Sequence, residues 1–178
     1  MKRALFLLTF LSTLSACTRT ELTGPPNLRL GRDECAECGM IINEDRCSAA
    51  LLISDDGGRE HALFDDIGCM LDYERPVTVI ETFVHDHATR AWVPASQATF
   101  ILVDEKSFST PMGSGMAAFA DPAQAAAAAA AHAGRTLDFS ALPDARREWM
   151  RTRFGSPDRA PVSPASPTSP TSAEGERK

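Results

Sequence analysis

The chain has 178 residues, of which 43% are hydrophobic, and a formal net charge of −6 at neutral pH. This acidic balance argues against nucleic acid as a partner, because binding to phosphates requires a basic surface. Beyond the N-terminal segment there is no second apolar run of the roughly 20 residues that a membrane-spanning helix requires. The rest of the chain is long enough for one ordinary domain or two very small ones.

The N-terminus has the features of a lipoprotein export signal. Lys2 and Arg3 precede an apolar core at residues 4–11, and Leu14-Ser15-Ala16-Cys17 resembles a bacterial lipobox. The apolar core is shorter than a transmembrane helix, which disfavours that alternative. We therefore expect residues 1–16 to be removed as a signal peptide and the cysteine of the lipobox, Cys17, to be lipidated.

Both ends of the remaining chain have the composition of linkers. Residues 17–30 contain Pro25-Pro26 and predict a tether between the lipid and the folded body. Residues 155–178 are dominated by Pro, Ser, Thr and charged residues, and such a segment cannot bury enough apolar surface to offset the entropy lost on ordering. We expect this C-terminal tail to be disordered.

A first group of elements follows the tether. Residues 47–53 and 60–64 predict two strands joined by a turn of Asp and Gly residues. A helix should follow, with Asp65 or Asp66 as its N-cap. Residues 77–84 are rich in β-branched and aromatic side chains, which favours another strand.

A similar pattern occurs a second time. Residues 99–103 predict a strand and residues 112–119 a returning segment. The next helix has clear boundaries, because Asp121 is a good N-cap, Pro122 suits the first helical position and Gly134 ends an alanine-rich run.

Two further elements complete the α+β prediction, a strand at residues 135–139 and a helix at residues 144–154. The two patterns share a local signature, since each returning segment closes on a phenylalanine, Phe64 or Phe119, shortly before an acidic cap. Such a junction also occurs by chance. The preferred interpretation is two small, related ββα-type units. They are expected at residues 31–90 and 91–154.

Three sulfur atoms lie within the hexapeptide Cys35-Ala36-Glu37-Cys38-Gly39-Met40. Thiolates and thioethers select soft metal ions, above all Cu(I). An oxidising compartment also favours a Cys35–Cys38 disulfide, and a redox-active pair is a third interpretation, which the poor helix formers after Gly39 weaken. Zinc would combine both thiols with Cys47 and Cys69, although that second pair is widely spaced. From the residues alone, copper, zinc and a disulfide stay open.

Two more methionines, Met112 and Met116, flank the segment Gly113-Ser114-Gly115, where the backbone could approach a ligand closely. Thioethers bind Cu(I) and do not form disulfides. The alternative is that isolated methionines fill gaps in a core. Cys69 and Met70 are adjacent in a predicted helix and point about 100 degrees apart, so we expect Met70 in the core and leave the role of Cys69 open.

Histidines and carboxylates form no catalytic pattern. His85 and His87 flank Asp86 and give a weak metal signal, but such a segment is more often a solvated loop. There is no phosphate-binding glycine loop, no serine elbow and no identifiable base for a cysteine nucleophile. We therefore do not expect an enzyme.

Taken together, the lipobox and three sulfur-containing motifs resemble the NosL copper lipoproteins. The motifs are Cys35-x-x-Cys38-Gly39-Met40-Ile41, Phe64-Asp65-Asp66-Ile67-Gly68-Cys69-Met70 and Pro111-Met112-Gly113-Ser114-Gly115-Met116-Ala117-Ala118-Phe119-Ala120-Asp121, and the likeness spans residues 31–143. The resemblance implies two ββα-type units similar to part of the organomercurial lyase. It also implies Cys38, Met40 and Met112 as Cu(I) ligands; Cys35 is the next candidate, followed by Met116 and Cys69.

Membership of that family would imply a Cu(I) chaperone anchored by lipid to the cell membrane or outer membrane and facing the periplasm. Its cargo would serve the copper-sulfide centre of nitrous oxide reductase, with ABC-type membrane proteins of the maturation complex as partners. Two alternatives are kept. One is a copper chaperone for a different cuproenzyme, and the other is a disulfide- or zinc-stabilised structural lipoprotein that scaffolds a membrane complex.

Overall fold

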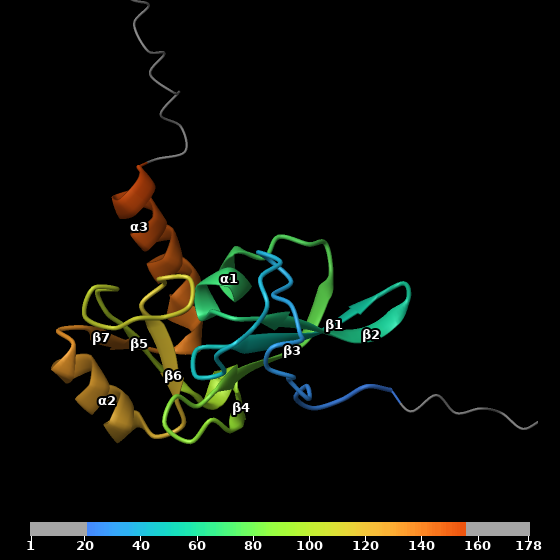
Figure 1. Ribbon diagram of the computed structural model, residues 1–178, viewed down its shortest axis with the longest axis horizontal. Helices are drawn as coiled ribbons and strands as arrows, with labels where there is room; N and C mark the ends of the chain where they lie inside the picture. The colour runs from blue at the N-terminus through green and yellow to red at the C-terminus, as the bar shows by residue number, and fades with distance from the viewer. Residues whose placement is uncertain (1–20, 156–178) are drawn as a thin grey trace, which may run out of the picture. The chain divides into compact units, whose positions relative to one another are not determined.

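The structure is a computed structural model that describes residues 21–155 (Figure 1). The predicted signal peptide, the lipidated Cys17 and the tail from residue 156 onward lie outside the described residues. The chain divides into one unit up to Phe139 and a second from Ser140. Among residues 21–155, no helix is long and apolar enough to cross a membrane.

The first sheet contains four antiparallel strands in the order β2-β1-β3-β4. Strands β1 (Ala49–Asp55) and β2 (Gly58–Phe64) form a hairpin, and α1 (Ile67–Asp72) follows it. Strand β3 (Thr78–His85) then returns beside β1, and β4 (Trp92–Pro94) pairs with β3. The first five residues of β1 are buried, because this strand lies between two neighbours. A core cluster in this sheet consists of Ala50, Leu52 and Phe83, with Leu63 and Trp92 packed against it.

The second sheet contains three antiparallel strands in the order β6-β5-β7. Strands β5 (Thr99–Leu102) and β6 (Met116–Phe119) form the hairpin, α2 (Pro122–Ala131) follows, and β7 (Arg135–Leu137) returns beside β5. The helix α2 begins as predicted, because the Asp121 carboxylate accepts a hydrogen bond from the Ala123 N–H at 2.8 Å. The buried core under α2 consists of Cys47, Ile101, Val103, Ala117, Phe119, Ala125 and Ala129.

Both sheets are built from the same succession of elements: a hairpin, a helix, and a strand that returns beside the first strand of the hairpin (Figure 1). The predicted α+β class with two hairpin–helix units is therefore confirmed. Each unit also includes the strand after its helix, which makes the repeat ββαβ rather than ββα. The sequence does not predict β4 or the 3-10 turns η1 (Ala95–Gln97) and η2 (Phe139–Ala141). Because β4 belongs to the first sheet, that sheet extends past residue 90.

The two sheets are joined at the end of β3. Asp86 forms a parallel bridge with Ala118 on β6, and the His87 N–H donates a hydrogen bond to the Ala118 carbonyl at 2.8 Å. The Asp86 carboxylate accepts a hydrogen bond from the Ala120 N–H at 3.1 Å. The prediction of a solvated loop at residues 85–87 is wrong, since His85 and Asp86 are buried where β3 reaches the second sheet.

The unit from Ser140 contains the helix α3 (Leu142–Phe154), close to the predicted range 144–154. An acidic residue in its first turn, Asp144, and the basic Arg151 and Arg153 in its last turn complement the helix dipole. Trp149 is half-buried, and the Arg153 guanidinium lies 5.0 Å from the centre of its ring. The helix ends at Gly155, whose φ of 80° lies in the left-handed region.

Candidate metal centre

A tight loop brings Cys35 and Cys38 together. The Cys35 N–H donates a hydrogen bond to the Met40 carbonyl at 2.8 Å, and the Gly39 N–H donates to the Cys35 carbonyl at 2.8 Å. Gly39 has a φ of 74°, a conformation that a residue with a Cβ adopts only at a cost. The glycine in the Cys-x-x-Cys-Gly-Met motif therefore closes the loop that carries the two thiols.

The loop is fixed to the first sheet by contacts on both sides. The Ala36 N–H donates a hydrogen bond to the Leu63 carbonyl near the end of β2 at 2.7 Å. After the loop, Ile42 is fully buried, and its N–H donates to the Asp33 carbonyl at 2.8 Å. The Asp33 carboxylate in turn accepts hydrogen bonds from the backbone and guanidinium of Arg29. These contacts place the loop beside the junction of β2 and α1.

That junction supplies the other half of the site. Asp66 is the N-cap of α1, and its carboxylate accepts a hydrogen bond from the Gly68 N–H at 2.7 Å. Asp65 lies directly before the cap and Cys69 lies in the first turn. Helical side chains lean toward the N-terminus, so the Cys69 sulfur is directed back toward Asp65 and the thiol loop.

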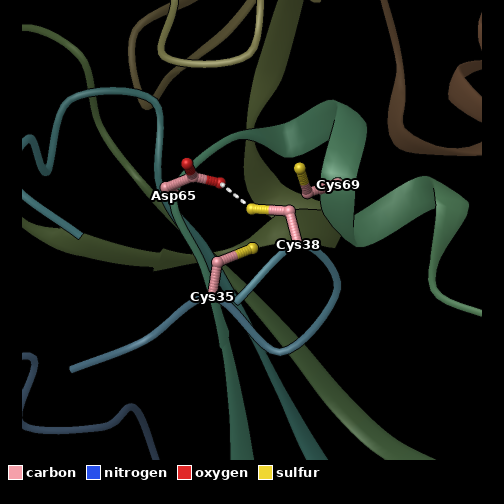
Figure 2. A group of neighbouring side chains, drawn as sticks. All are labelled: Cys35, Cys38, Asp65 and Cys69. Carbon is pink, nitrogen blue, oxygen red and sulfur yellow. Dashed lines mark hydrogen bonds between the residues drawn. The ribbon is translucent and has the colours of Figure 1, made fainter. Parts of the chain in front are cut away.

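Four side chains converge as a result. One ligand atom from each of Cys35, Cys38, Asp65 and Cys69 lies within 4.8 Å of all the others (Figure 2). The Cys38 Sγ lies 4.0 Å from the Asp65 Oδ1. With metal–sulfur bonds of about 2.3 Å, two sulfurs on one ion lie about 3.8 to 4.6 Å apart, from tetrahedral to linear geometry. Small side-chain adjustments would therefore let one ion contact the three sulfurs.

Burial divides this cluster into an outer and an inner part. Cys38 is exposed, whereas Cys35 and Cys69 are only 2% and 6% exposed and Asp65 is 3% exposed. Solvent consequently reaches the cluster through the Cys38 side.

The protonation states within the cluster are unequal. Hydrogen bonding with the Cys69 thiol lowers the pKa of Cys35, although burial opposes this effect, and the same interaction together with burial raises the pKa of Cys69. Burial also raises the pKa of Cys38. Burial and interaction with Cys35 raise the pKa of Asp65 to about 6. The site therefore favours one thiolate, on Cys35, beside two protonated thiols, and metal binding there would release protons.

Two predicted ligands, Met40 and Met112, lie at the surface. Their side chains are 48% and 40% exposed, which is unusual for methionine. Met40 and Asp65 line the same open pocket, of about 340 Å³, together with Pro111, the neighbour of Met112. Met40 and the residue before Met112 thus border the pocket that adjoins the cluster.

The position of the Met112 loop is fixed by Asp66. The Asp66 Oδ2 accepts hydrogen bonds from the Thr110 hydroxyl at 2.7 Å and from the Met112 N–H at 2.9 Å. The glycine at the end of this loop has a packing role: a Cβ on Gly115 would lie 2.2 Å from the Val103 carbonyl oxygen. Gly115 is therefore required for backbone packing, whereas the sequence alone allowed a close approach of this segment to a ligand.

The remaining predicted sulfur residues lie elsewhere. Met116 is fully buried on β6 and Met70 is buried in α1, as expected of Met70. Cys47 is in the core under α2, where burial raises the pKa of its thiol to about 12. The zinc site of Cys47 with the other three cysteines is not assembled, and the four cysteines in the described residues are free thiols rather than a Cys35–Cys38 disulfide.

Sequence reasoning missed Asp65 as a site residue and left Cys69 open. The sequence does contain a signal that both belong to the site. Two adjacent acidic residues, Asp65 and Asp66, precede the helix, and only one of them can be its N-cap. The second carboxylate was therefore free to face the thiols, and Cys69 lies close enough to the helix start to face it.

The comparisons with known proteins agree with this fold. A sequence model of the NosL family matches residues 29–146. The crystal structure of the copper chaperone NosL from Shewanella denitrificans is similar, with a TM-score of 0.52 and 23% sequence identity over 68% of this chain and 99% of that chain. No curated protein matches. The family match covers well over half of the 178 residues, and the chain belongs to the NosL family.

Proposed function

We propose that this protein is a copper chaperone that binds Cu(I) at the cluster of Cys35, Cys38, Asp65 and Cys69, with Met40 and Met112 as further ligands. The observation that carries the proposal is the convergence of three thiols and a carboxylate within 4.8 Å. The similar protein from Shewanella denitrificans is a copper chaperone, which supports the same cargo.

The chemistry of the donors favours Cu(I). Thiolates and thioethers are the soft ligands that Cu(I) prefers, and the site offers both kinds within one loop, Cys35 to Met40. Three thiols and a carboxylate would also suit zinc. The exposed thioethers of Met40 and Met112 favour Cu(I), because zinc sites in proteins use thiolate, imidazole and carboxylate ligands rather than thioethers.

The exposure of Cys38 suits a chaperone. A carrier must release its ion to another protein, and ligand exchange requires an incoming ligand to reach the metal. Cys38 is accessible while Cys35 and Cys69 are buried, so an acceptor can attack from one side only. A wholly buried site of the structural kind would lack this access.

The proposed destination of the copper rests on the family resemblance alone. We propose that Cys17 is lipidated, that the lipid holds the protein on the periplasmic side of the cell membrane or outer membrane, and that the copper serves assembly of the copper-sulfide centre of nitrous oxide reductase. The ABC-type membrane proteins of the maturation complex are the proposed partners. No catalytic role is proposed.

Anaerobic titration tests the binding step. The full-length protein, reduced and held in detergent, is titrated with Cu(I) and Zn(II) in competition. The proposal expects about one Cu(I) bound with clear preference over Zn(II), and weaker binding by Cys38→Ser and by Met40→Leu. The variant Cys47→Ala, which removes a thiol outside the cluster, should bind as the wild type does. Equal affinity for the two ions would contradict a chaperone for copper.

A deletion strain tests delivery. If the protein supplies nitrous oxide reductase, the reductase isolated from a strain without it should be depleted of copper, and the wild-type gene should restore loading. Normal copper content in the deletion strain would point to a different cuproenzyme or to no delivery role.

A further inference from the structure

We propose that the end of the first sheet that carries the β1–β2 turn lies against a phospholipid bilayer, and that the copper loop points away from the lipid. The exposed side chains of Leu22, Val79 and Ile80 form the surface that contacts the bilayer. The inference rests on one part of the proposed function, the lipid anchor at Cys17, and assigns the orientation in which that anchor holds the protein.

The chain that precedes the copper loop is held along β2. The Glu21 carboxylate forms an ion pair with the Arg59 guanidinium at 2.8 Å, and the same guanidinium donates a hydrogen bond to the Leu22 carbonyl at 3.4 Å. Two residues further along both segments, the His61 Nε2–H donates to the Gly24 carbonyl at 2.8 Å. The described part of the predicted tether therefore has a fixed course beside the strand.

This course places the start of the tether and the copper loop at opposite ends of β2. Glu21 meets the strand at Arg59, next to the β1–β2 turn, whereas the Ala36 N–H of the copper loop meets it at the Leu63 carbonyl. The four positions from Arg59 to Leu63 correspond to about 13 Å along a strand. In Figure 1 the blue start of the described chain and the β1–β2 turn lie toward the same side of the picture.

The anchor lies close to the turn end in the sequence. Cys17 precedes Glu21 by four positions, and four residues span at most about 14 Å. A lipid on Cys17 therefore keeps the turn end of the sheet near the bilayer, because Glu21 is itself held to Arg59.

Exposed apolar side chains lie at this same end. Val79 and Ile80, at the start of β3, are 48% and 41% exposed, and Leu22 is 40% exposed. Val79 lies opposite Ile53 of β1, and Arg59, the hydrogen-bond partner of Leu22, lies opposite the next residue of β1. Ile80 has no partner on β1, because the register shifts there. Large apolar side chains exposed together at the anchored end of the sheet fit contact with lipid.

The charges at this end indicate which kind of lipid surface it fits. Asp55, Asp56 and Glu60 are exposed at or beside the turn, and they outnumber the neighbouring Arg59. Anionic lipids attract basic segments, so electrostatic attraction does not supply this contact. The anchor and the apolar side chains supply it, and the matching surface is a bilayer of zwitterionic phospholipid. The exposed Cys38 then stays clear of the lipid and open to an acceptor from the aqueous side.

Photo-crosslinking tests the orientation. The processed lipoprotein is reconstituted in phosphatidylcholine vesicles with p-benzoylphenylalanine in place of Val79 or of Ile41. The second position is the matched control, because Ile41 is 42% exposed and lines the pocket with Asp65 at the copper end. Irradiation should give lipid adducts at position 79 and none at position 41. Equal adducts at the two positions, or adducts of position 79 with protein instead of lipid, would overturn the inference.

A variant tests the role of the docked tether. Arg59→Ala/His61→Ala removes the three contacts to the tether and leaves Cys17 in place. Position 79 should then lose its excess of lipid adducts over position 41, while the Cu(I) affinity stays that of the wild type. Circular dichroism checks that the variant is folded. An unchanged excess in the folded variant would contradict an orientation set by the tether.

Mass spectrometry of the processed protein separates failure of this inference from failure of the proposed function. An unmodified Cys17 would overturn both the orientation and the anchoring, whatever the protein binds. A lipidated protein that binds Cu(I) but gives no excess of adducts at position 79 would overturn the orientation alone. A protein with the expected adducts and no preference for Cu(I) over Zn(II) would overturn the copper chaperone and leave the orientation standing.

Discussion

The Asp66 carboxylate accepts a hydrogen bond from the Met112 N–H at 2.9 Å, although 46 positions separate the two residues in the sequence. The same carboxylate caps α1 by accepting a hydrogen bond from the Gly68 N–H, and it accepts another from the Thr110 hydroxyl. Asp66 is fully buried. One side chain thus joins the first ββαβ unit to the methionine loop of the second.

Replacing Asp66 should therefore lower the free energy of unfolding by more than the loss of a helix cap alone would. Asp66→Ala removes the cap, worth about 1 kcal/mol, and two further hydrogen bonds to a charged group, each worth about 1.5 to 3 kcal/mol. The matched control is Asp121→Ala, which removes the N-cap of α2 at an exposed site. Urea unfolding should show Asp66→Ala to be less stable than Asp121→Ala by at least about 2 kcal/mol. Equal losses would mean that the link to the methionine loop contributes nothing.

Gly115 provides a test of backbone packing. Its φ is 68°, and a Cβ there would meet the Val103 carbonyl oxygen at 2.2 Å. Gly113 has nearly the same φ, 69°, but its Cβ would approach only the end of the Glu105 side chain, at 3.1 Å. Gly113→Ala should cost about 1 to 2 kcal/mol of unfolding free energy for the left-handed conformation. Gly115→Ala should lower the free energy of unfolding by clearly more than Gly113→Ala does. Similar losses for the two variants in urea unfolding would contradict the close approach of position 115 to the Val103 carbonyl oxygen.

The sequence predicts much of the fold because the local signals are strong. Asp121 and Pro122 start α2, and the Asp-Gly turn joins β1 to β2. Both signals act through neighbouring residues in the sequence and do not depend on tertiary contacts. The strand β4 has three residues, too few for a pattern, and it forms only because β3 offers an edge. The returning segment at 112–119 is a strand only from Met116, since Asp66 and Val103 hold the residues before it in a loop.

The site is less predictable than the fold. Cys35 and Cys38 come together through a local loop, which the spacing and Gly39 indicate. Cys69 joins them because contacts such as the hydrogen bond from the Ala36 N–H to the Leu63 carbonyl place the loop against α1. That contact is between backbone atoms and leaves no mark in the side-chain pattern. In the sequence Cys47 is as plausible a ligand as Cys69, yet its side chain lies in the core under α2.

Thiol reactivity should follow the burial of the four described cysteines. Cys38 is exposed, whereas Cys35, Cys47 and Cys69 are buried. The raised pKa of Cys38 slows its reaction, but the reagent reaches the buried thiols poorly, so brief alkylation of the reduced, metal-free protein should modify Cys38 ahead of the others, as mass spectrometry would show. One equivalent of Cu(I) should protect it. Faster labelling of Cys69 than of Cys38 would show that α1 opens in solution.

A buried histidine, His85, and a half-buried one, His87, predict how the free energy of unfolding depends on pH. Burial lowers the pKa of His85, although Asp45 partly opposes this, and burial also lowers the pKa of His87. The unfolded chain then binds protons more readily than the folded one, so the stability contribution is complete above about pH 6.5 and is lost as the pH falls through that value.

The corresponding measurement is urea unfolding at several pH values between about 7.5 and 5.5. The wild type should lose stability as the pH falls, by up to about 1.4 kcal/mol per pH unit for each histidine. The variant His85→Gln/His87→Gln should be less stable at neutral pH, because His85 bonds to Ser48 at 2.6 Å and stacks on Trp92. Its stability should change less with pH. Parallel pH profiles for the two proteins would assign the dependence to other groups.

The most direct test of the copper site compares the Cu(I) affinity of the wild type with that of Cys35→Ser/Cys38→Ser/Cys69→Ser and of Cys47→Ala, measured by anaerobic competition with a Cu(I) chelator. Removal of the three clustered thiols should weaken binding by more than about 100-fold, beyond what loss of a supporting contact causes. Removal of Cys47, which lies outside the cluster, should leave the affinity within about threefold of the wild type. Wild-type affinity in the triple variant would contradict the assignment of this cluster as the copper site.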